Sequence, residues 1–454
     1  MKKTSLFAVV MAILIAGTAC SNKSEKKESK QQEAIASSPT NEWYKDATIY
    51  EVNIRQYTEE GTFDAFREHL PRLKELGIDI LWIMPIHPIG EKNRKGELGS
   101  YYSVKDYKGI NPEFGTKEDF RELVDAVHEK DMRIIIDWVA NHTAWDHEWV
   151  SENPEWYKKD STGNMVAPFD WTDVVALNYE KQPVRNAMRD AMKYWVEDFN
   201  IDGYRCDVAG MVPVDFWENT VNELDKIKPV FMLAEDEGEV ELLDNAFEMH
   251  YGWEFHHLMN EIAQGKKQAD VLADYFAKTD TLLDDDDVKM NFLTNHDENS
   301  WNGTIEERMG DAQKAMAVLA YTVPGMPLIY TGQEIGLDKQ LEFFKKDPIQ
   351  WKDSPLEDFY KKLNTLKEEN PALWAPGFGG TFELMESNHP EKTFVFTRKK
   401  GDNEVAVLLN LTGNPLDIEA DIEGAYENFL TGNSVEADGT FVMPSWGYKV
   451  LVKQ

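Results

Sequence analysis

Two apolar segments each end in a carboxylate and lie one strand–helix–strand repeat apart: I-D-G-Y-R-C-D at residues 201–207 and V-F-M-L-A-E at residues 230–235. Both are typical of buried strands in a parallel sheet. If they are neighbouring strands of a parallel barrel, Asp207 and Glu235 emerge at its carboxyl end, where such barrels build active sites. Cleavage of a glycosidic bond typically requires two carboxyl groups that face one cleft.

The same alternation of apolar runs and helical segments extends along most of the chain. Eight runs read as strands: I-Y-E-V-N-I, I-D-I-L-W-I-M-P, R-I-I-I-D-W-V, D-G-Y-R-C-D, P-V-F-M-L-A-E, A-F-E-M-H-Y, K-M-N-F-L-T and M-P-L-I-Y. Eight strand–helix repeats predict an α/β fold, the (β/α)8 TIM barrel. A doubly wound open sheet would place a Gly-rich phosphate loop after its first strand, but that stretch reads R-Q-Y-T-E-E-G-T-F.

Helices are expected between these runs. Phe120, Leu123, Val124 and Val127 recur at i, i+3, i+4 and i+7, with Thr116 expected as the N-cap. Two further segments form apolar helix faces: Phe63, Phe66, Leu70 and Leu73, closed by Gly77; and Met188, Met192, Trp195 and Phe199.

The pattern predicts four parts after residue 19. Residues 20–41 are polar and lack aromatic residues, which is typical of a flexible tether. Residues 42–375 form the barrel, with a loop-rich excursion at 142–182 after the third strand that is long enough to suggest a functional role. Residues 376–454 contain short strands such as F-V-F-T-R, V-A-V-L-L-N-L and W-G-Y-K-V-L-V, which predict a C-terminal antiparallel β-sandwich.

Residues 1–19 read as an export signal. Two lysines precede an apolar run that is too short to span a bilayer, and A-G-T-A-C ends at Cys20. A small residue before Cys resembles the lipobox of bacterial lipoproteins, in which that cysteine is acylated. Gly17 stands where Leu is usual, so ordinary secretion remains an alternative. The expectation is a lipoprotein anchored to the bacterial cell envelope at the outer membrane, on its periplasmic or surface face.

Charge and cysteine content exclude several classes of partner and linkage. The formal net charge of −34 makes nucleic acid a poor partner and fits an uncharged substrate. The only cysteines are Cys20 and Cys206, so no intrachain disulfide is expected, and Cys206 is predicted to be a buried barrel residue.

Further polar residues fall at the ends of the predicted strands. Asp137 ends the third strand, and T-N-H-D follows the seventh and supplies His296 and Asp297. Arg205 lies two residues before Asp207, so both side chains share one face of the strand. A guanidinium there should keep Asp207 ionised, as a nucleophile requires.

Four of these segments together resemble the signature regions of the α-amylase family, glycoside hydrolase family 13: D-W-V-A-N-H, G-Y-R-C-D, the Glu of M-L-A-E, and T-N-H-D. The resemblance runs from Trp43 to the C-terminus. It implies a barrel, a domain B excursion and a C-terminal sandwich. It also implies retaining hydrolysis of α-glucosidic bonds in starch-like glucans or maltooligosaccharides, through a covalent glycosyl-Asp intermediate.

The resemblance assigns a role to each matching residue. It makes Asp207 the nucleophile, Glu235 the general acid/base, and Asp297 the carboxylate that holds sugar hydroxyls. The other implied roles are as follows: His142 and His296 hydrogen-bond the sugar, Tyr102 stacks beneath it although Tyr101 replaces a usual Gly, Arg205 orients the nucleophile, and Asp137 and Asn141 are structural.

The calcium site of typical amylases looks incomplete. A Lys-His pair after the nucleophile is replaced by Gly210 and Met211, and a domain B carboxylate is replaced by Ala176. Only Asn141 remains, which is too few ligands for a cation that takes six or more oxygens. No metal site and no required cofactor are therefore predicted, although a different calcium site stays open.

Substrate linkage and reaction outcome are not determined by these motifs. Val208, directly after the nucleophile, occurs in family members that cut α-1,6 bonds, so α-1,6 cleavage stays open beside α-1,4 cleavage. A transglycosylase would use the same covalent intermediate. A non-catalytic glycan-binding lipoprotein is a third reading, which the complete set of Asp207, Glu235 and Asp297 disfavours.

Overall fold

Within residues 42–454, which the computed structural model describes, eight parallel strands close into a barrel. Around the barrel the strands follow the order β1-β10-β9-β8-β7-β6-β3-β2. Their bounds are β1 (Ile49–Val52), β2 (Ile80–Ile83), β3 (Arg133–Trp138), β6 (Gly203–Cys206), β7 (Phe231–Ala234), β8 (Met249–Tyr251), β9 (Val288–Phe292) and β10 (Met326–Tyr330). Each of the eight apolar runs overlaps one of these strands, so the predicted TIM barrel is confirmed.

Alternate residues of the strands build two different cores. Ile135, Leu233 and Met290 belong to a cluster enclosed by the barrel. Their neighbours Ile136 and Met232 belong to the larger cluster between the strands and the helices. Side chains alternate across a strand, so both faces of each strand are buried. This explains why the runs are apolar throughout instead of alternating with polar residues.

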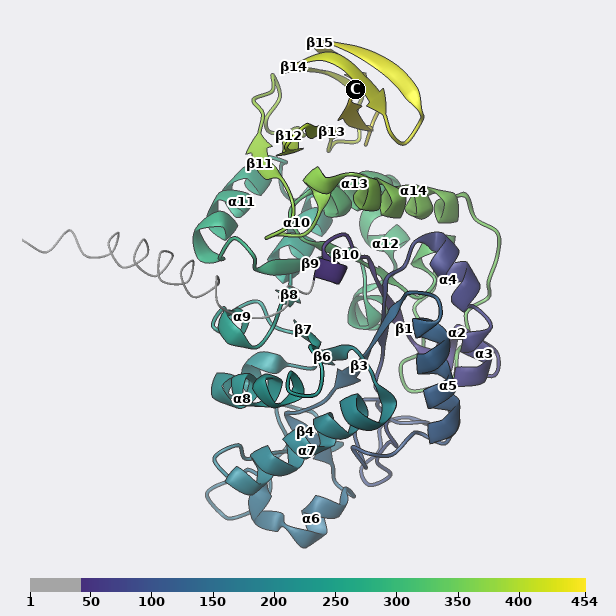
Figure 1. Cartoon of the computed structure of the whole chain (residues 1–454), viewed down its shortest axis with the longest axis vertical. Helices are drawn as coiled ribbons and strands as arrows, with labels where there is room; N and C mark the ends of the chain where they lie inside the picture. Colours follow the sequence, from purple (N-terminus) through teal and green to yellow (C-terminus); the bar gives the residue numbers. More distant parts are fainter. Residues whose placement is uncertain (1–41) are drawn as a thin grey trace, which may run out of the picture. The chain divides into compact units, whose positions relative to one another are not determined.

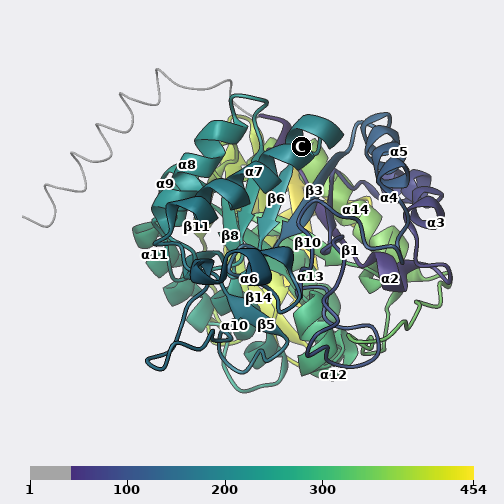
Figure 2. The same cartoon turned by 90° about the horizontal axis from the view of Figure 1, so that it is seen from below.

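Helices surround the barrel, as Figure 2 shows. Their bounds are α2 (Ile54–Tyr57), α3 (Phe63–Arg67), α4 (Leu70–Leu76), α5 (Lys117–His128), α7 (Gln182–Phe199), α8 (Val214–Leu224), α9 (Leu242–Asn245), α10 (Trp253–Ala263), α11 (Val271–Leu282), α12 (Ile305–Met309), α13 (Gln313–Thr322) and α14 (Pro355–Glu369).

Local sequence signals explain several helix ends. Thr116 caps α5 through a capping box with Asp119, as the sequence predicted. Gly77 ends α4 in the left-handed conformation, with φ of 89°. The apolar face that begins at Phe63 is divided between α3 and α4, because Pro71 favours a helix start and opposes continuation from the preceding turn.

The segment between β3 and α7 forms a small excursion. Strands β4 (His142–Ala144) and β5 (Val174–Ala176) pair antiparallel there, and α6 (Glu148–Glu152) lies between them in the chain. The backbone of this excursion contacts the loop after β2, because Ala144 donates its N–H to the carbonyl of Val104.

A six-stranded antiparallel sheet follows the barrel, shown in yellow-green in Figure 1. Its order is β11-β12-β13-β16-β14-β15. The bounds are β11 (Thr381–Leu384), β12 (Thr393–Lys400), β13 (Asn403–Asn410), β14 (Leu416–Asn428), β15 (Asn433–Met443) and β16 (Tyr448–Lys453). Residues from both halves of the sheet share one apolar core, as in a sandwich. Arg398 ties this sheet to the barrel by donating to the carbonyl of Thr322.

The structure also bears on the remaining sequence expectations. Cys206 is free and buried in β6, as predicted. The signal peptide, Cys20 and the tether lie outside the described residues. Among the helices of residues 42–454, none has the length and apolar character needed to cross a membrane.

Candidate active site

The carboxyl ends of four barrel strands bring the predicted polar residues together. Asp207 directly follows β6, and its N–H donates to the carbonyl of Trp138 at 2.9 Å. Glu235 directly follows β7, and its N–H donates to the carbonyl of Cys206 at 3.0 Å. These bonds continue the barrel ladder by one residue, so both carboxylates lie on the inner face at the rim. His296 and Asp297 come from the segment after β9.

Arg205 is the central cation of the site. Its Nη1 donates to Asp137 Oδ1 at 2.9 Å and to Asp207 Oδ1 at 3.3 Å. Its Nη2 lies 2.9 Å from Glu235 Oε2, a contact that sequence spacing did not predict. Burial opposes the charge of Arg205, but Asp137 and Glu235 raise the pKa of its guanidinium well above the ordinary value. One buried cation therefore contacts three carboxyls.

The two central carboxyls, Asp207 and Glu235, raise each other's tendency to stay protonated. Burial and the neighbouring Glu235 raise the pKa of Asp207 well above its ordinary value, and Arg205 offsets only part of this. Burial also raises the pKa of Glu235, against the opposing effect of Arg205. The expectation that Arg205 alone keeps Asp207 ionised is therefore too simple. Burial and a second carboxyl act against it, and the pair titrates as a unit.

The residue after Asp207 has a strained backbone. Val208 has φ of 39° and ψ of 50°, in the left-handed region that is unfavourable for a β-branched residue. In this conformation its N–H donates to Glu235 Oε2 at 2.8 Å. Strain of this kind concentrates at functional sites, where the surrounding structure holds it in place.

A second hydrogen-bonded chain supports the opposite side of the site. His296 Nδ1 lies 2.6 Å from Glu51 Oε1, and Nε2 lies 2.7 Å from the Tyr102 hydroxyl. That hydroxyl donates to Asp137 Oδ2 at 3.0 Å. Burial alone would lower the pKa of His296, but Asp297 and Glu51 outweigh it and raise the pKa to about 9. His296 is therefore an imidazolium at neutral pH, with both ring nitrogens donating.

Glu51 was not predicted from the sequence. It lies in β1 between residues of the barrel wall and is fully buried. The available signal was a single charged residue within an otherwise apolar strand, because a buried carboxylate needs a partner. Trp82 was also missed, and its Nε1 donates to Asp137 Oδ2 at 3.2 Å.

The pair of His296 and Glu51 should make stability depend on pH. Because folding raises the pKa of His296, the charged ring stabilises the folded protein fully at pH values below the ordinary pKa of about 6.5. This stabilisation is lost as pH rises through about 9, the pKa in the folded protein. We expect Glu51→Gln to destabilise the protein near pH 6.5 by roughly 1 kcal/mol, because Asp297 accounts for the larger part of the raised pKa of His296. The difference should shrink as pH rises through about 9, where the His296 imidazolium loses its proton. Melting temperatures of both proteins from pH 6 to 10 test this, and a constant difference would contradict it.

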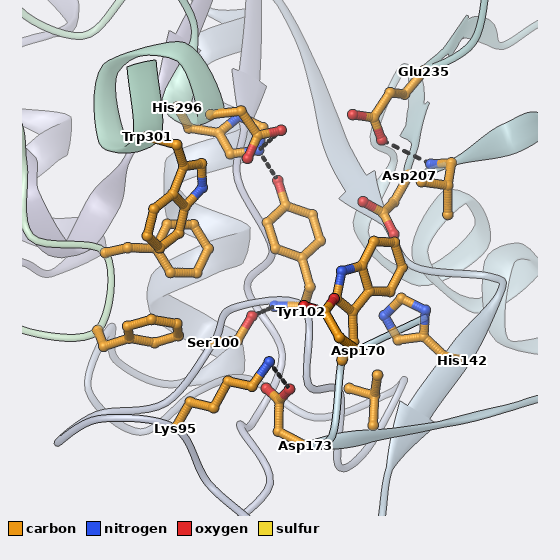
Figure 3. Close-up of a pocket in the computed structure, with 16 residues that line it drawn as sticks. Lys95, Ser100, Tyr102, His142, Asp170, Asp173, Asp207, Glu235, His296 and Trp301 are labelled. Carbon is orange, nitrogen blue, oxygen red and sulfur yellow. Dashed lines mark hydrogen bonds and ion pairs between the residues drawn. The ribbon is translucent and has the colours of Figure 1, made fainter. Parts of the chain in front are cut away.

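Six predicted residues line one cavity of about 450 Å³, shown in Figure 3. They are Tyr102, His142, Asp207, Glu235, His296 and Asp297. Arg205, Asp137 and Asn141 are buried and are not among the residues that line it. Aromatic residues that the sequence did not assign also line the cavity: Trp171, Trp301, Phe343 and Phe344.

His142 faces this cavity as a neutral ring. It begins β4 and packs edge-on against Trp171, with ring centroids 5.5 Å apart. Burial lowers its pKa to about 4, so it is uncharged at neutral pH and can both donate and accept a hydrogen bond. The cavity therefore holds one neutral and one charged histidine.

The residues at the position of the usual amylase calcium do not fit that ion. The amide of Asn141 lies 3.3 Å from His142 Nδ1. Ala176 and Met211 offer no side-chain oxygen, and a Cβ at Gly210 would lie 2.2 Å from Asp236 Oδ2. Among residues 42–454, no three His, Cys, Asp or Glu side chains group closely enough to hold a metal.

Known proteins share the barrel fold of this chain and are similar to it in sequence. The α-amylase catalytic domain family matches residues 35–174 and 150–380. The crystal structure of an α-amylase from Lactobacillus plantarum superimposes with a TM-score of 0.83 and 31% identity, over 90% of this chain and 99% of that one.

Two curated relatives are more distant in sequence. The α-amylase MalA of Haloarcula japonica is 27% identical over 83% of this chain and 57% of its own length. An α-1,4-glucan:maltose-1-phosphate maltosyltransferase of Picrophilus torridus is 26% identical over 77% of this chain and 59% of its own length. The chain thus spans a little over half the length of both relatives.

Proposed function

Because this chain belongs to the α-amylase family, we propose that it is a retaining glycoside hydrolase that cleaves α-glucosidic bonds in starch-like glucans or maltooligosaccharides. One observation carries this proposal: Asp207, Glu235 and Asp297 line a single cavity together with Tyr102. The linkage is mainly α-1,4, and Val208 leaves α-1,6 bonds within reach.

The reaction proceeds in two displacements. Asp207 attacks the anomeric carbon and forms a glycosyl ester, while Glu235 transfers its proton to the departing oxygen. Glu235 then takes a proton from water, which attacks the same carbon and releases the sugar with retained configuration. Burial raises the pKa of both carboxyls, and the reaction requires the state in which Glu235 carries the proton and Asp207 is ionised. Val208 N–H and Arg205 then stabilise the glutamate after it has donated.

The surrounding residues position the sugar. Tyr102 presents its ring to the cavity and stacks beneath the sugar at the cleavage point. The neutral His142 hydrogen-bonds a sugar hydroxyl, and Asp297, which is 39% exposed, accepts from others. Both N–H groups of His296 are donated to Glu51 and Tyr102, so His296 acts on the sugar through its positive charge and by positioning Tyr102. Arg205 orients Asp207, and Asp137 holds Arg205 in turn.

Incubation with maltoheptaose, pullulan and isomaltose tests the proposal. We expect maltoheptaose to be shortened over time, with products that initially have the α-anomeric configuration. Cleavage of isomaltose, or conversion of pullulan to maltotriose, would add α-1,6 activity, because both reactions break α-1,6 bonds. Failure to convert any of the three substrates, by a folded preparation, would contradict the proposal.

Transglycosylation is the second candidate, and similarity to a maltosyltransferase favours it. It differs only in whether a sugar or water resolves the covalent intermediate. Products longer than the starting maltoheptaose, formed early and in larger amounts than the short products, would favour the transferase.

No calcium is required in this proposal, because Ala176 and Met211 replace the usual ligands. We expect EDTA to leave activity unchanged and to shift the melting temperature by less than about 1 °C, because removal of a bound ion would destabilise the protein by mass action. A drop of several degrees that calcium restores would contradict this.

The N-terminal signal supports anchoring to the bacterial envelope, with Cys20 acylated and the outer membrane as its location. Two or three acyl chains suffice for stable anchoring, at about 0.8 kcal/mol per buried CH₂. We expect wild type to fractionate with membranes and Cys20→Ala to become soluble in the periplasm or medium. Wild-type protein that is already soluble and lacks lipid would contradict the anchor.

A further inference from the structure

One side of the cavity is formed by the loop after β2, residues 90–102, here called the wall loop. Its Lys95 and Ser100 line the cavity, and Tyr102 ends it. The proposed function does not assign a role to the rest of this loop. Its contacts with two distant segments determine which parts of a glucan chain can enter.

The wall loop is fastened to the excursion at one end. Lys95 Nζ lies 3.1 Å from Asp173 Oδ1, and Asp173 is almost completely buried. The N–H of Glu91 donates to the carboxylate of Asp146 at 3.0 Å. Close backbone approach adds to these contacts, because a Cβ at Gly90 would lie only 2.4 Å from Ala144 Cβ. These contacts hold the wall loop against the excursion at three points.

The second half of the wall loop contacts the segment after β10. The N–H of Leu98 donates to the carbonyl of Phe344 at 2.9 Å. Gly96 has φ of 64°, and a Cβ there would lie 2.4 Å from Phe344 Cβ. The buried ring of Tyr101 packs edge-on against Phe343, with centroids 5.3 Å apart. The wall is therefore continuous from Asp173 to Phe344.

The position of Glu235 identifies which end of the cavity is closed. In Figure 3 the Lys95–Asp173 pair and Glu235 lie at opposite ends of the cavity, with Tyr102 between them. The general acid contacts the leaving group, so the leaving group extends from the Glu235 end. The sugar that is attacked, and anything attached to its O4, extends toward Lys95 and Asp173.

We propose that the wall loop closes the non-reducing side of the site, so that the enzyme releases short saccharides from the non-reducing end of α-glucans. This inference rests on the proposed function. The cavity volume of about 450 Å³ lies in the lower part of the range for small-molecule sites, about 300–1,000 Å³, and suits a few sugar rings. The ion pair of Lys95 and Asp173 determines the depth of the closed end.

Two maltoheptaose substrates test this, one free and one with its terminal O4 and O6 blocked by an ethylidene group. We expect wild type to consume the blocked substrate at least about 100-fold more slowly, because the wall leaves no room beyond the terminal sugar. The double variant Lys95→Ala/Asp173→Asn opens the wall without leaving a buried charge unpaired. It should consume the blocked substrate at least about 10-fold faster than wild type.

Lys92→Ala is the matched control, because Lys92 lies in the same loop but over the Trp145 ring, 5.7 Å from its centroid, and does not line the cavity. It should behave like wild type on both substrates. Equal consumption of free and blocked maltoheptaose by wild type would overturn the inference and leave the proposed function intact. Consumption of neither would contradict the proposed function, and the inference with it. Melting temperatures establish that the variants are folded.

Discussion

Asp207→Asn is expected to reduce kcat for maltoheptaose by about 10³-fold or more, because the covalent step loses its nucleophile. The substitution also removes the charge that faces Arg205, while Asp137 and Glu235 continue to hold that cation. The fold and glucan binding should therefore remain close to wild type. Steady-state kinetics on maltoheptaose, with binding measured by calorimetry, test this.

Asp215→Asn provides the matched control. Asp215 is exposed in α8 and pairs with Arg185 away from the cavity, so its loss should leave kcat unchanged. If purified Asp207→Asn protein, expressed from a strain free of wild type, keeps more than about one per cent of wild-type activity, Asp207 is not the nucleophile.

Glu235→Gln is expected to lose glucan hydrolysis to a similar extent but to retain activity on α-glucosyl fluoride. Fluoride needs little protonation to depart, so the first displacement can proceed without the acid. The amide oxygen of Gln can still accept from Val208 N–H, so the rim geometry should persist. Initial rates on both substrates measure the effect.

The result is judged by the rate on α-glucosyl fluoride divided by the rate on glucan, compared between the variant and wild type. Glu254→Gln, at an exposed position paired with Lys278, should leave this ratio unchanged. An equal loss on both substrates in Glu235→Gln would show that Glu235 is not the acid.

Local pattern was enough to predict the barrel. Each strand is buried on both faces, so each appears as an unbroken apolar run, and Thr116 and Gly77 mark helix ends by their own chemistry. The antiparallel hairpin of β14 and β15 was not singled out. One face of β14 is exposed and charged, and small or weakly apolar residues such as Ala420 fill part of the other.

The sequence by itself also placed Asp207 and Glu235 at one rim. A carboxylate that follows a buried parallel strand must emerge at the carboxyl end of the barrel, whatever the rest of the chain does. The family motifs supplied their predicted roles and those of Asp297 and His296. The position of each carboxylate at the end of its strand is a local property, so a single sequence is enough to predict it.

Only the tertiary structure revealed how these groups are charged and enclosed. Glu51 and His296 are separated by 245 residues, and no periodicity in β1 or in the segment after β9 indicates that they meet. Lys95 and Asp173 pair between two irregular segments. Such segments lack the helix or strand periodicity from which the direction of a side chain can be predicted. The protonation of these groups depends on distance and burial, and both arise only when the barrel closes and removes water. The chain pattern thus determined which residues reach the rim, while packing determined their protonation and the shape of the cavity.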